Sequence, residues 1–240
     1  MRVTFLAWGV SAAILVALAA WIGHRHVRSV GIFGILIDSR GRFSLTHLQL
    51  ALWTMVVLSL LLGVFFGRLW EGVADPLGFD IPPGLLAVLG ISVGSAVTAS
   101  AVKAYKDTTV PERVKASEPG GENAPSFGQI FLAEEGPLAD RVIDIAKFQN
   151  FGITCVAVVA YVALAINTIR DAETPDNITS LPTFTAGLIT LIGISHAGYV
   201  GGKLPTPGPE GSKAPGLTVA SLGATPTGVW RRERNPGRSQ

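Results

Sequence analysis

The stretch Leu86–Ser92, LAVLGIS, indicates an internal repeat, because nearly the same stretch returns as Ile189–Ser195, ITLIGIS. The similarity between the two repeats is stronger upstream of these two stretches. Residues 44–49 and 144–149 lie one hundred positions apart, and each segment holds a capping residue, a base and a glutamine at the same places. Polar positions match as well as apolar ones, so chance similarity is the weaker explanation. The sequence therefore predicts a duplicated membrane hairpin with two apolar helices in each unit.

The composition is too hydrophobic for an ordinary soluble domain of 240 residues, with 48% apolar residues and a mean hydropathy of +0.44. A helix needs about twenty apolar residues to cross the hydrocarbon core of a bilayer. A backbone in lipid must also satisfy its own hydrogen bonds, so each such window is expected to be helical. Five windows have the required length: 3–22, 48–66, 84–102, 151–169 and 184–200. These windows predict an all-α membrane protein with five transmembrane helices.

The basic residues predict the orientation of these helices. Sixteen of the nineteen Lys and Arg residues fall on one set of loops, whereas the loops on the other side are acidic. The positive-inside rule places the basic loops in the cytoplasm. We therefore expect the N-terminus outside, the C-terminus in the cytoplasm, and two hairpins that run in parallel behind one N-terminal helix.

The chain divides into six predicted segments. These are the transmembrane helix 1–22, the cytoplasmic elbow 23–46, the hairpin 47–102, the cytoplasmic loop 103–148, the hairpin 149–202, and the basic, Pro/Gly-rich tail 203–240. The first helix also resembles a signal peptide, and cleavage near Trp21 is the alternative to a retained helix. In the loop 103–148, Val142, Ile145 and Phe148 recur every three residues, which predicts an amphipathic helix at the cytoplasmic face.

Aromatic and capping residues are expected at the ends of the spans. Trp53 and Tyr105 are predicted at headgroup depth on the cytoplasmic side, and Trp70 on the outer side. Ser44 and Asp144 are predicted to cap the helices that follow them, because each offers a side-chain acceptor to free backbone amides.

The third and fifth predicted spans are rich in small residues, which let helix backbones approach closely in a membrane. Two pairs have GxxxG spacing. The residues expected to make this helix contact are Gly90, Gly94, Gly193, Gly198 and Gly202. The structural interpretation is that the two spans form the central packing surface.

A second interpretation of the same spans is a narrow polar path that coordinates water or an ion. Its candidate residues are Ser92, Ser95, Thr98, Thr190, Ser195 and His196. Against this, the interiors of the five spans contain no Asp, Glu, Lys or Arg, which pumps and ion-coupled carriers place there. Gln49 and Gln149 form a separate polar pair at equivalent positions. Their amides are expected to bond to each other, or each to the elbow of the other unit.

The sequence contains no motif for catalysis, for a bound metal or for a cofactor. We therefore expect a protein that is not an enzyme and carries no cofactor. The tail holds Arg231, Arg232 and Arg234, which are expected either to complete the basic cytoplasmic side or to contact anionic lipid or an acidic partner. The expected partners are the lipid bilayer, a homo-oligomer and a cytoplasmic protein that binds the elbows and tail, but not nucleic acid.

At residues 48–54, at Phe148-Gln149 and at the two Gly-Ile-Ser stretches, the chain resembles a group of uncharacterised bacterial multi-span membrane proteins with paired hairpins. The resemblance covers about residues 30–203 and implies a bacterial cytoplasmic membrane, but no specific activity. Two function hypotheses follow from the sequence. One is a membrane scaffold or anchor that docks a cytoplasmic partner, and the other is an oligomeric channel for small ions or solutes lined by Ser and Thr.

Overall fold

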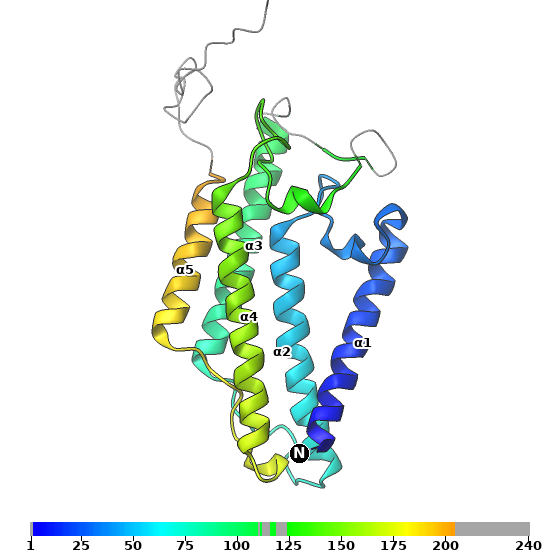
Figure 1. The fold of residues 1–240 in the computed structure, drawn as a ribbon, viewed down its shortest axis with the longest axis vertical. Coiled ribbons are helices and arrows are strands. Elements are labelled where there is room, and N and C mark those ends of the chain that lie inside the picture. The colour runs from blue at the N-terminus through cyan, green and yellow to red at the C-terminus, as the bar shows by residue number, and fades with distance from the viewer. Residues whose placement is uncertain (1, 110, 112–115, 119–123, 205–240) are drawn as a thin grey trace, which may run out of the picture. The chain divides into compact units, whose positions relative to one another are not determined.

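The computed structural model describes residues 2–109, 111, 116–118 and 124–204 (Figure 1). Its α-helices are α1 (Arg2–His26), α2 (Leu45–Trp70), α3 (Pro83–Thr109), α4 (Ile145–Asp171) and α5 (Ala186–Gly201). Short 3-10 helices lie between them: η1 (Arg28–Leu36), η3 (Phe127–Ile130) and η4 (Pro175–Asn177). The described residues form no β-strand, only isolated bridges. The predicted tail beyond residue 204, with Arg231, Arg232 and Arg234, lies outside the described residues.

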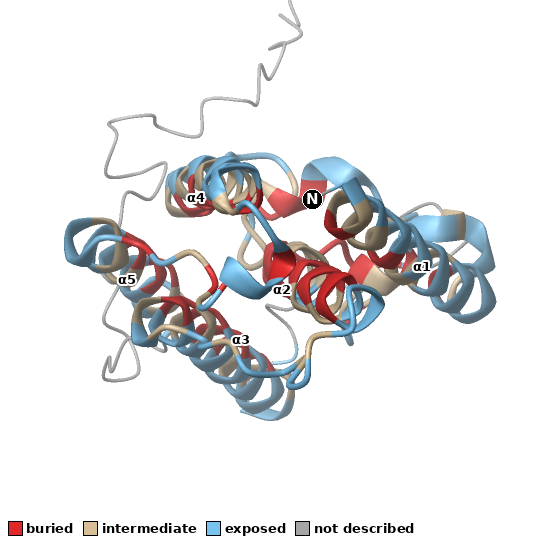
Figure 2. Cartoon of the chain, turned by 90° about the horizontal axis from the view of Figure 1, so that it is seen from below, coloured by how far each residue is buried: buried red, intermediate tan, exposed pale blue. Residues whose placement is uncertain are grey.

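Four helices form a closed ring in which α2 contacts α3, α3 contacts α5, α5 contacts α4, and α4 contacts α2 (Figure 2). The first hairpin, α2–α3, and the second hairpin, α4–α5, run in the same direction (Figure 1). Helix α1 packs outside the ring against α2 and η1. Helices α2 and α4 both begin at one end of the bundle, which we call the elbow end. They finish at the opposite end, which we call the loop end.

Helices α1 to α4 are each long and apolar enough to cross a membrane. Helix α1 in particular exposes large apolar side chains, among them Leu6, Val10 and Ile14. Such a surface fits lipid better than water. Helix α5 has only 16 residues, or about 24 Å at 1.5 Å per residue, which is short of the bilayer core of about 30 Å. The chain is thus an all-helical protein with the character of a membrane-embedded bundle.

The extended segment that precedes α5 fills the part of the bundle that this short helix does not reach. Between η4 and α5, Ile178, Leu181 and Phe184 are buried in the same apolar cluster as the ring helices. Trp53 belongs to this core and packs edge-on against Tyr161 and Phe184, with ring centroids 6.1 and 5.9 Å away. The prediction of Trp53 as a headgroup anchor is therefore wrong, because its ring fills the space between helices.

Trp70 and Tyr105 are exposed near the ends of α2 and α3, where the sequence places them.

The closest helix approach uses two glycines that the sequence analysis did not select. A Cβ atom on Gly63 would lie 2.6 Å from the Cβ of Trp8, and one on Gly67 would lie 2.6 Å from the Thr4 hydroxyl oxygen. These glycines of α2 have GxxxG spacing and let α1 pack tightly on α2. Trp8 Nε1 also donates a hydrogen bond to Ser59 Oγ at 3.1 Å.

Helix α3 does pack against α5, but of the five predicted glycines only Gly193 lies at that contact within this chain. Added Cβ atoms on Gly90, Gly94 and Gly198 would meet nothing within 4 Å, and one on Gly193 would lie 3.7 Å from Ile91 Cδ1. For Gly202 the nearest atoms belong to its own last turn. The spacing of small residues indicates a helix surface without bulky side chains, but it does not predict which helix packs against that surface.

Residues 127–144, which we call the second elbow because they precede α4 as the first elbow (residues 23–46) precedes α2, form a compact loop and not the predicted amphipathic helix. Leu132 forms an antiparallel bridge with Ile143, and the Asp144 amide donates to the Phe131 carbonyl at 2.8 Å. Gly136, with a φ of 84°, makes the turn. The three-residue pattern of Val142, Ile145 and Phe148 therefore spans a bridge and the start of α4. The first elbow is closed in a similar way, by a bridge between Ile37 and Phe43.

Candidate functional site

A layer of buried charges at the elbow end is centred on the Glu134 carboxylate. Lys147 Nζ lies 2.7 Å from it, Lys203 Nζ 2.9 Å and Lys103 Nζ 3.3 Å. Arg40 lies at 3.8 Å. Lys147 belongs to α4 and Lys103 to α3, whereas Lys203 follows α5 and Arg40 belongs to the first elbow. A single carboxylate therefore joins both hairpins and both elbows.

Glu134 stays ionised at neutral pH because of these neighbours. Burial alone would raise the pKa of its carboxyl group, since the charged form loses its water. The positive charges of Lys203, Lys103 and Lys147 outweigh burial and hold the pKa of Glu134 well below its ordinary value. The Glu134 carboxylate therefore carries its negative charge at pH 7 and pairs with the three lysines.

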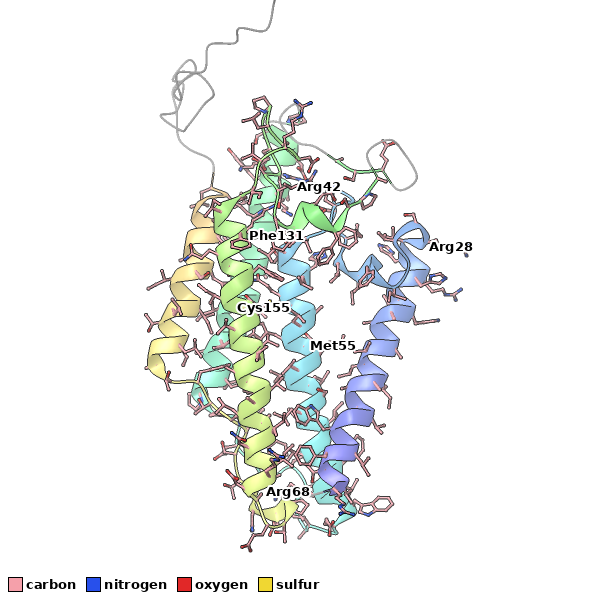
Figure 3. The ribbon with its side chains drawn as sticks, viewed as in Figure 1. Arg28, Arg42, Met55, Arg68, Phe131 and Cys155 are labelled. Atoms are coloured by element: carbon pink, nitrogen blue, oxygen red, sulfur yellow. The ribbon has the colours of Figure 1, made fainter. Side chains whose placement is uncertain are left out.

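Two arginines of the first elbow bind the second elbow. Arg40 Nε donates to Asp107 at 2.9 Å, and its Nη1 donates to Glu135 at 3.2 Å. Arg42 lies at the elbow end (Figure 3) and is almost fully buried. Its Nη1 donates to Asp140 at 2.8 Å. Burial lowers the pKa of Arg40, but Asp107 and Glu135 raise it more, and the net direction is upward. The two elbows are therefore fixed to each other by paired charges.

The two hairpins contribute matching ion pairs. Lys103 follows the third predicted span and binds Asp38 of the first elbow at 2.6 Å. Lys203, one hundred positions later, binds Glu134 of the second elbow at 2.9 Å. Burial raises the pKa of Asp38, but Lys103 and the backbone hydrogen bond from Arg42 lower it by a larger amount. The pKa of Asp38 is therefore below its ordinary value. Each pair ties the end of one hairpin to the elbow where that hairpin began.

A polar cavity lies beside each of these pairs. The cavity next to Asp38 and Lys103 has a volume of about 290 Å³ and is also lined by Ser44, Thr46 and His47. The cavity next to Glu134 and Lys203 has about 170 Å³ and is also lined by Asp144, Lys147 and Lys106. The ionised groups of both cavities are already paired with one another, so the layer joins segments of the chain without needing an external ion.

Of the two predicted caps, only one acts as a side-chain cap. The Asp144 carboxylate accepts hydrogen bonds from the Ala146 and Lys147 amides, as predicted. Ser44 stands at the corresponding position before α2, but its side chain makes no capping hydrogen bond.

The predicted polar path is divided between the interior and the surface. Ser92, Ser95, Ser195 and His196 are buried, whereas Thr98 and Thr190 are exposed. The two threonine hydroxyls donate to carbonyls of their own helices, at Gly94 and Ala186. Ser95 Oγ lies 2.9 Å from His196 Nδ1, and Ser195 donates to Asn150 Oδ1 at 3.2 Å. Most of these hydroxyls therefore join helices to one another or back-bond within a helix.

The predicted glutamine pair does not form. Gln49 Nε2 donates to Thr154 Oγ1 at 2.7 Å, whereas Gln149 is exposed and the next residue, Asn150, takes the buried position. The physical reason is a rotation of α4: its buried face runs through Asn150, Tyr161 and Ala165, one residue later than the corresponding face of α2.

Arg68 is the residue that the sequence analysis missed at the loop end. It is 4% exposed, and its guanidinium donates to carbonyls of both loops between the hairpin helices (Figure 3). The acceptors, at 3.1–3.4 Å, are the carbonyl oxygens of Asp75, Gly78, Pro175, Asp176 and Ile178. The sequence signal was a lone arginine at the end of an apolar span, which was counted only as a loop charge.

Among the residues that the structure describes, no group of three or more His, Cys, Asp or Glu side chains is placed to hold a metal ion. Comparison of the chain with models of known protein families, with curated proteins and with solved structures finds no match. The function has to be argued from the geometry of this molecule alone.

Proposed function

We propose that the chain is a non-enzymatic membrane scaffold, built from a duplicated hairpin, whose elbow end lies in the cytoplasm and docks a protein partner there. The observation that carries this proposal is the ionic layer. Buried charges are costly unless they are paired, and here they hold the two elbows in one arrangement. A fixed surface of this kind supports the interpretation of the elbow end as a docking platform.

The elbows also offer contact area to a partner. Ile143 on the second elbow and Ile32 and Phe33 on the first are more than half exposed. A clamped backbone that presents apolar side chains binds at a lower cost in ordering entropy than a flexible one. We place this surface on the inner face of a bacterial cytoplasmic membrane, in keeping with the basic character of the elbow-end loops.

The interior of the ring favours the scaffold over a channel through a single chain. In its loop-end half, Leu60, Val64, Leu85 and Ile169 are almost completely buried in one apolar cluster. An ion passing along the ring axis would have to cross this packed layer without polar partners. Reconstituted protein should therefore give no ion flux above that of empty liposomes.

A photocrosslinking experiment in cells tests the docking proposal. A photoreactive amino acid at Ile143 should give one discrete adduct with a cytoplasmic protein, and the same amino acid at Leu77, in a loop at the other end, should not. Arg42→Gln, which removes the clamp to Asp140, should abolish the adduct. Identical adducts at both positions, or ion flux through liposomes, would count against a scaffold.

A further inference from the structure

A groove lies between α3 and α5, and it is lined in part by exposed residues of both helices. Figure 2 shows the two helices as neighbours in the ring. The volume of the groove is about 310 Å³. Gly90 and Gly94 of α3 and Gly193 and Ala197 of α5 give it bare walls. Added Cβ atoms on Gly90 and Gly94 would meet nothing within 4 Å. A helix backbone can therefore approach α3 here as closely as α1 approaches α2 at Gly63 and Gly67.

His196 also lines this groove and supplies a second, independent observation. Its side chain is 3% exposed, and its Nδ1 is engaged with Ser95. Its Nε2 is buried and has no hydrogen-bond partner among the described residues. An unpaired polar atom is costly in an apolar surrounding. The occupant of the groove must therefore bring a hydrogen-bonding group to the depth of His196.

We infer that the groove binds α3 of a second copy of this chain, in a parallel two-fold dimer that goes beyond the scaffold proposal. A two-fold axis along the membrane normal places identical residues of both copies at the same depth. Thr98 lies in the groove one turn from Ser95 and is exposed. The Thr98 hydroxyl donates to the Gly94 carbonyl and can still accept a hydrogen bond, so Thr98 of one copy satisfies His196 Nε2 of the other when that nitrogen carries the proton.

Two features favour a second copy over a lipid chain as the occupant. A lipid acyl chain has no polar group for His196 Nε2, whereas α3 of a second copy carries the Thr98 hydroxyl, which lines the same groove one turn from Ser95. Helix α5 is also about 6 Å shorter than the hydrocarbon core, and oligomerisation is one way for a short helix to reduce its mismatch with lipid.

Counting chains per particle tests this inference. Native mass spectrometry of the full-length protein in lipid nanodiscs should show two chains. Gly94→Leu should reduce this to one chain by filling the groove. Gly152→Leu is the matched control, because Gly152 is exposed on α4 with nothing within 4 Å, and it should leave the dimer intact. A single chain for the native protein, with or without bound lipid, would overturn the inference.

Two further variants keep the test decisive if Gly94→Leu fails to fold. Thr98→Val should weaken dimerisation about threefold, the usual size of one interhelical hydrogen bond in a membrane, whereas Thr190→Val should not. With Cys155 replaced by alanine, Gly94→Cys should crosslink two chains on mild oxidation and Gly152→Cys should not. Equal effects of the two threonine variants, or equal crosslinking at both glycine positions, would contradict an interface at this groove.

Discussion

Replacing Arg68 by leucine should lower the free energy of unfolding by about 3 kcal/mol, because hydrogen bonds from a charged group to buried carbonyls are lost. The guanidinium binds carbonyls of the two loops that connect the hairpin helices. Backbone without helical hydrogen bonds is tolerated inside a membrane protein only where other groups satisfy it. Loss of Arg68 removes five hydrogen bonds at once and leaves the buried Ile178 carbonyl without this donor, and an unmade buried hydrogen bond costs about 1–3 kcal/mol.

The measurement is the thermal midpoint of purified protein in detergent, which should fall by about 10 °C or more. Arg68→Lys should give an intermediate loss, because an ammonium has three donors and the guanidinium has five. Arg170→Leu is the control, since Arg170 lies exposed in the last turn of α4. Equal midpoints for Arg68→Leu and Arg170→Leu would show that the loops do not depend on the arginine.

Replacing Glu134 by glutamine should destabilise the elbow end by about 3–5 kcal/mol at pH 7. The substitution keeps the shape of the side chain, but it leaves Lys103, Lys147 and Lys203 close together without their shared carboxylate. Glu135→Gln is the matched control. Its carboxylate binds Lys106 and Arg40 but is 30% exposed, so the loss should be clearly smaller.

The effect of Glu134 should depend on pH in a direction that its pKa determines. The pKa is lower in the folded protein than the ordinary value of 4.5, so the stabilisation is complete above that value and is lost as pH falls through the folded pKa. Glutamine does not titrate. The difference in thermal midpoint between native protein and Glu134→Gln should therefore be large at pH 7 and shrink below pH 4.5. A difference that stays constant would refute the assigned network.

The positions of the helices along the chain were predictable, but their inward faces were not. Apolar windows and turn residues located the helices, and the acceptor at Asp144 located the start of α4. The inward face was harder, because a helix in lipid is apolar on both its buried and its exposed sides. For this reason Trp53 was assigned to the interface and Gln149 to the interior, and both assignments were wrong.

The ionic layer and the arginine cluster depend on contacts far apart in sequence. Arg42 and Asp140 are 98 positions apart, and Arg68 binds carbonyls up to 110 positions away. Nothing local marks such pairs. One signal was available: Lys103 and Lys203 share the spacing of one hundred positions that relates the two hairpins, and each binds an elbow carboxylate. Extending the internal comparison to these lysines would have predicted part of the site.

The central claim, that the bundle crosses a membrane with its elbows in the cytoplasm, is tested most directly by labelling single cysteines in intact cells. In a Cys155→Ala background, a membrane-impermeant maleimide should label Leu77→Cys, whose side chain is exposed in a loop at the loop end. It should label Leu138→Cys, on the second elbow, only after the membrane is permeabilised. Labelling of the elbow position in intact cells, or equal labelling of both positions, would contradict this account.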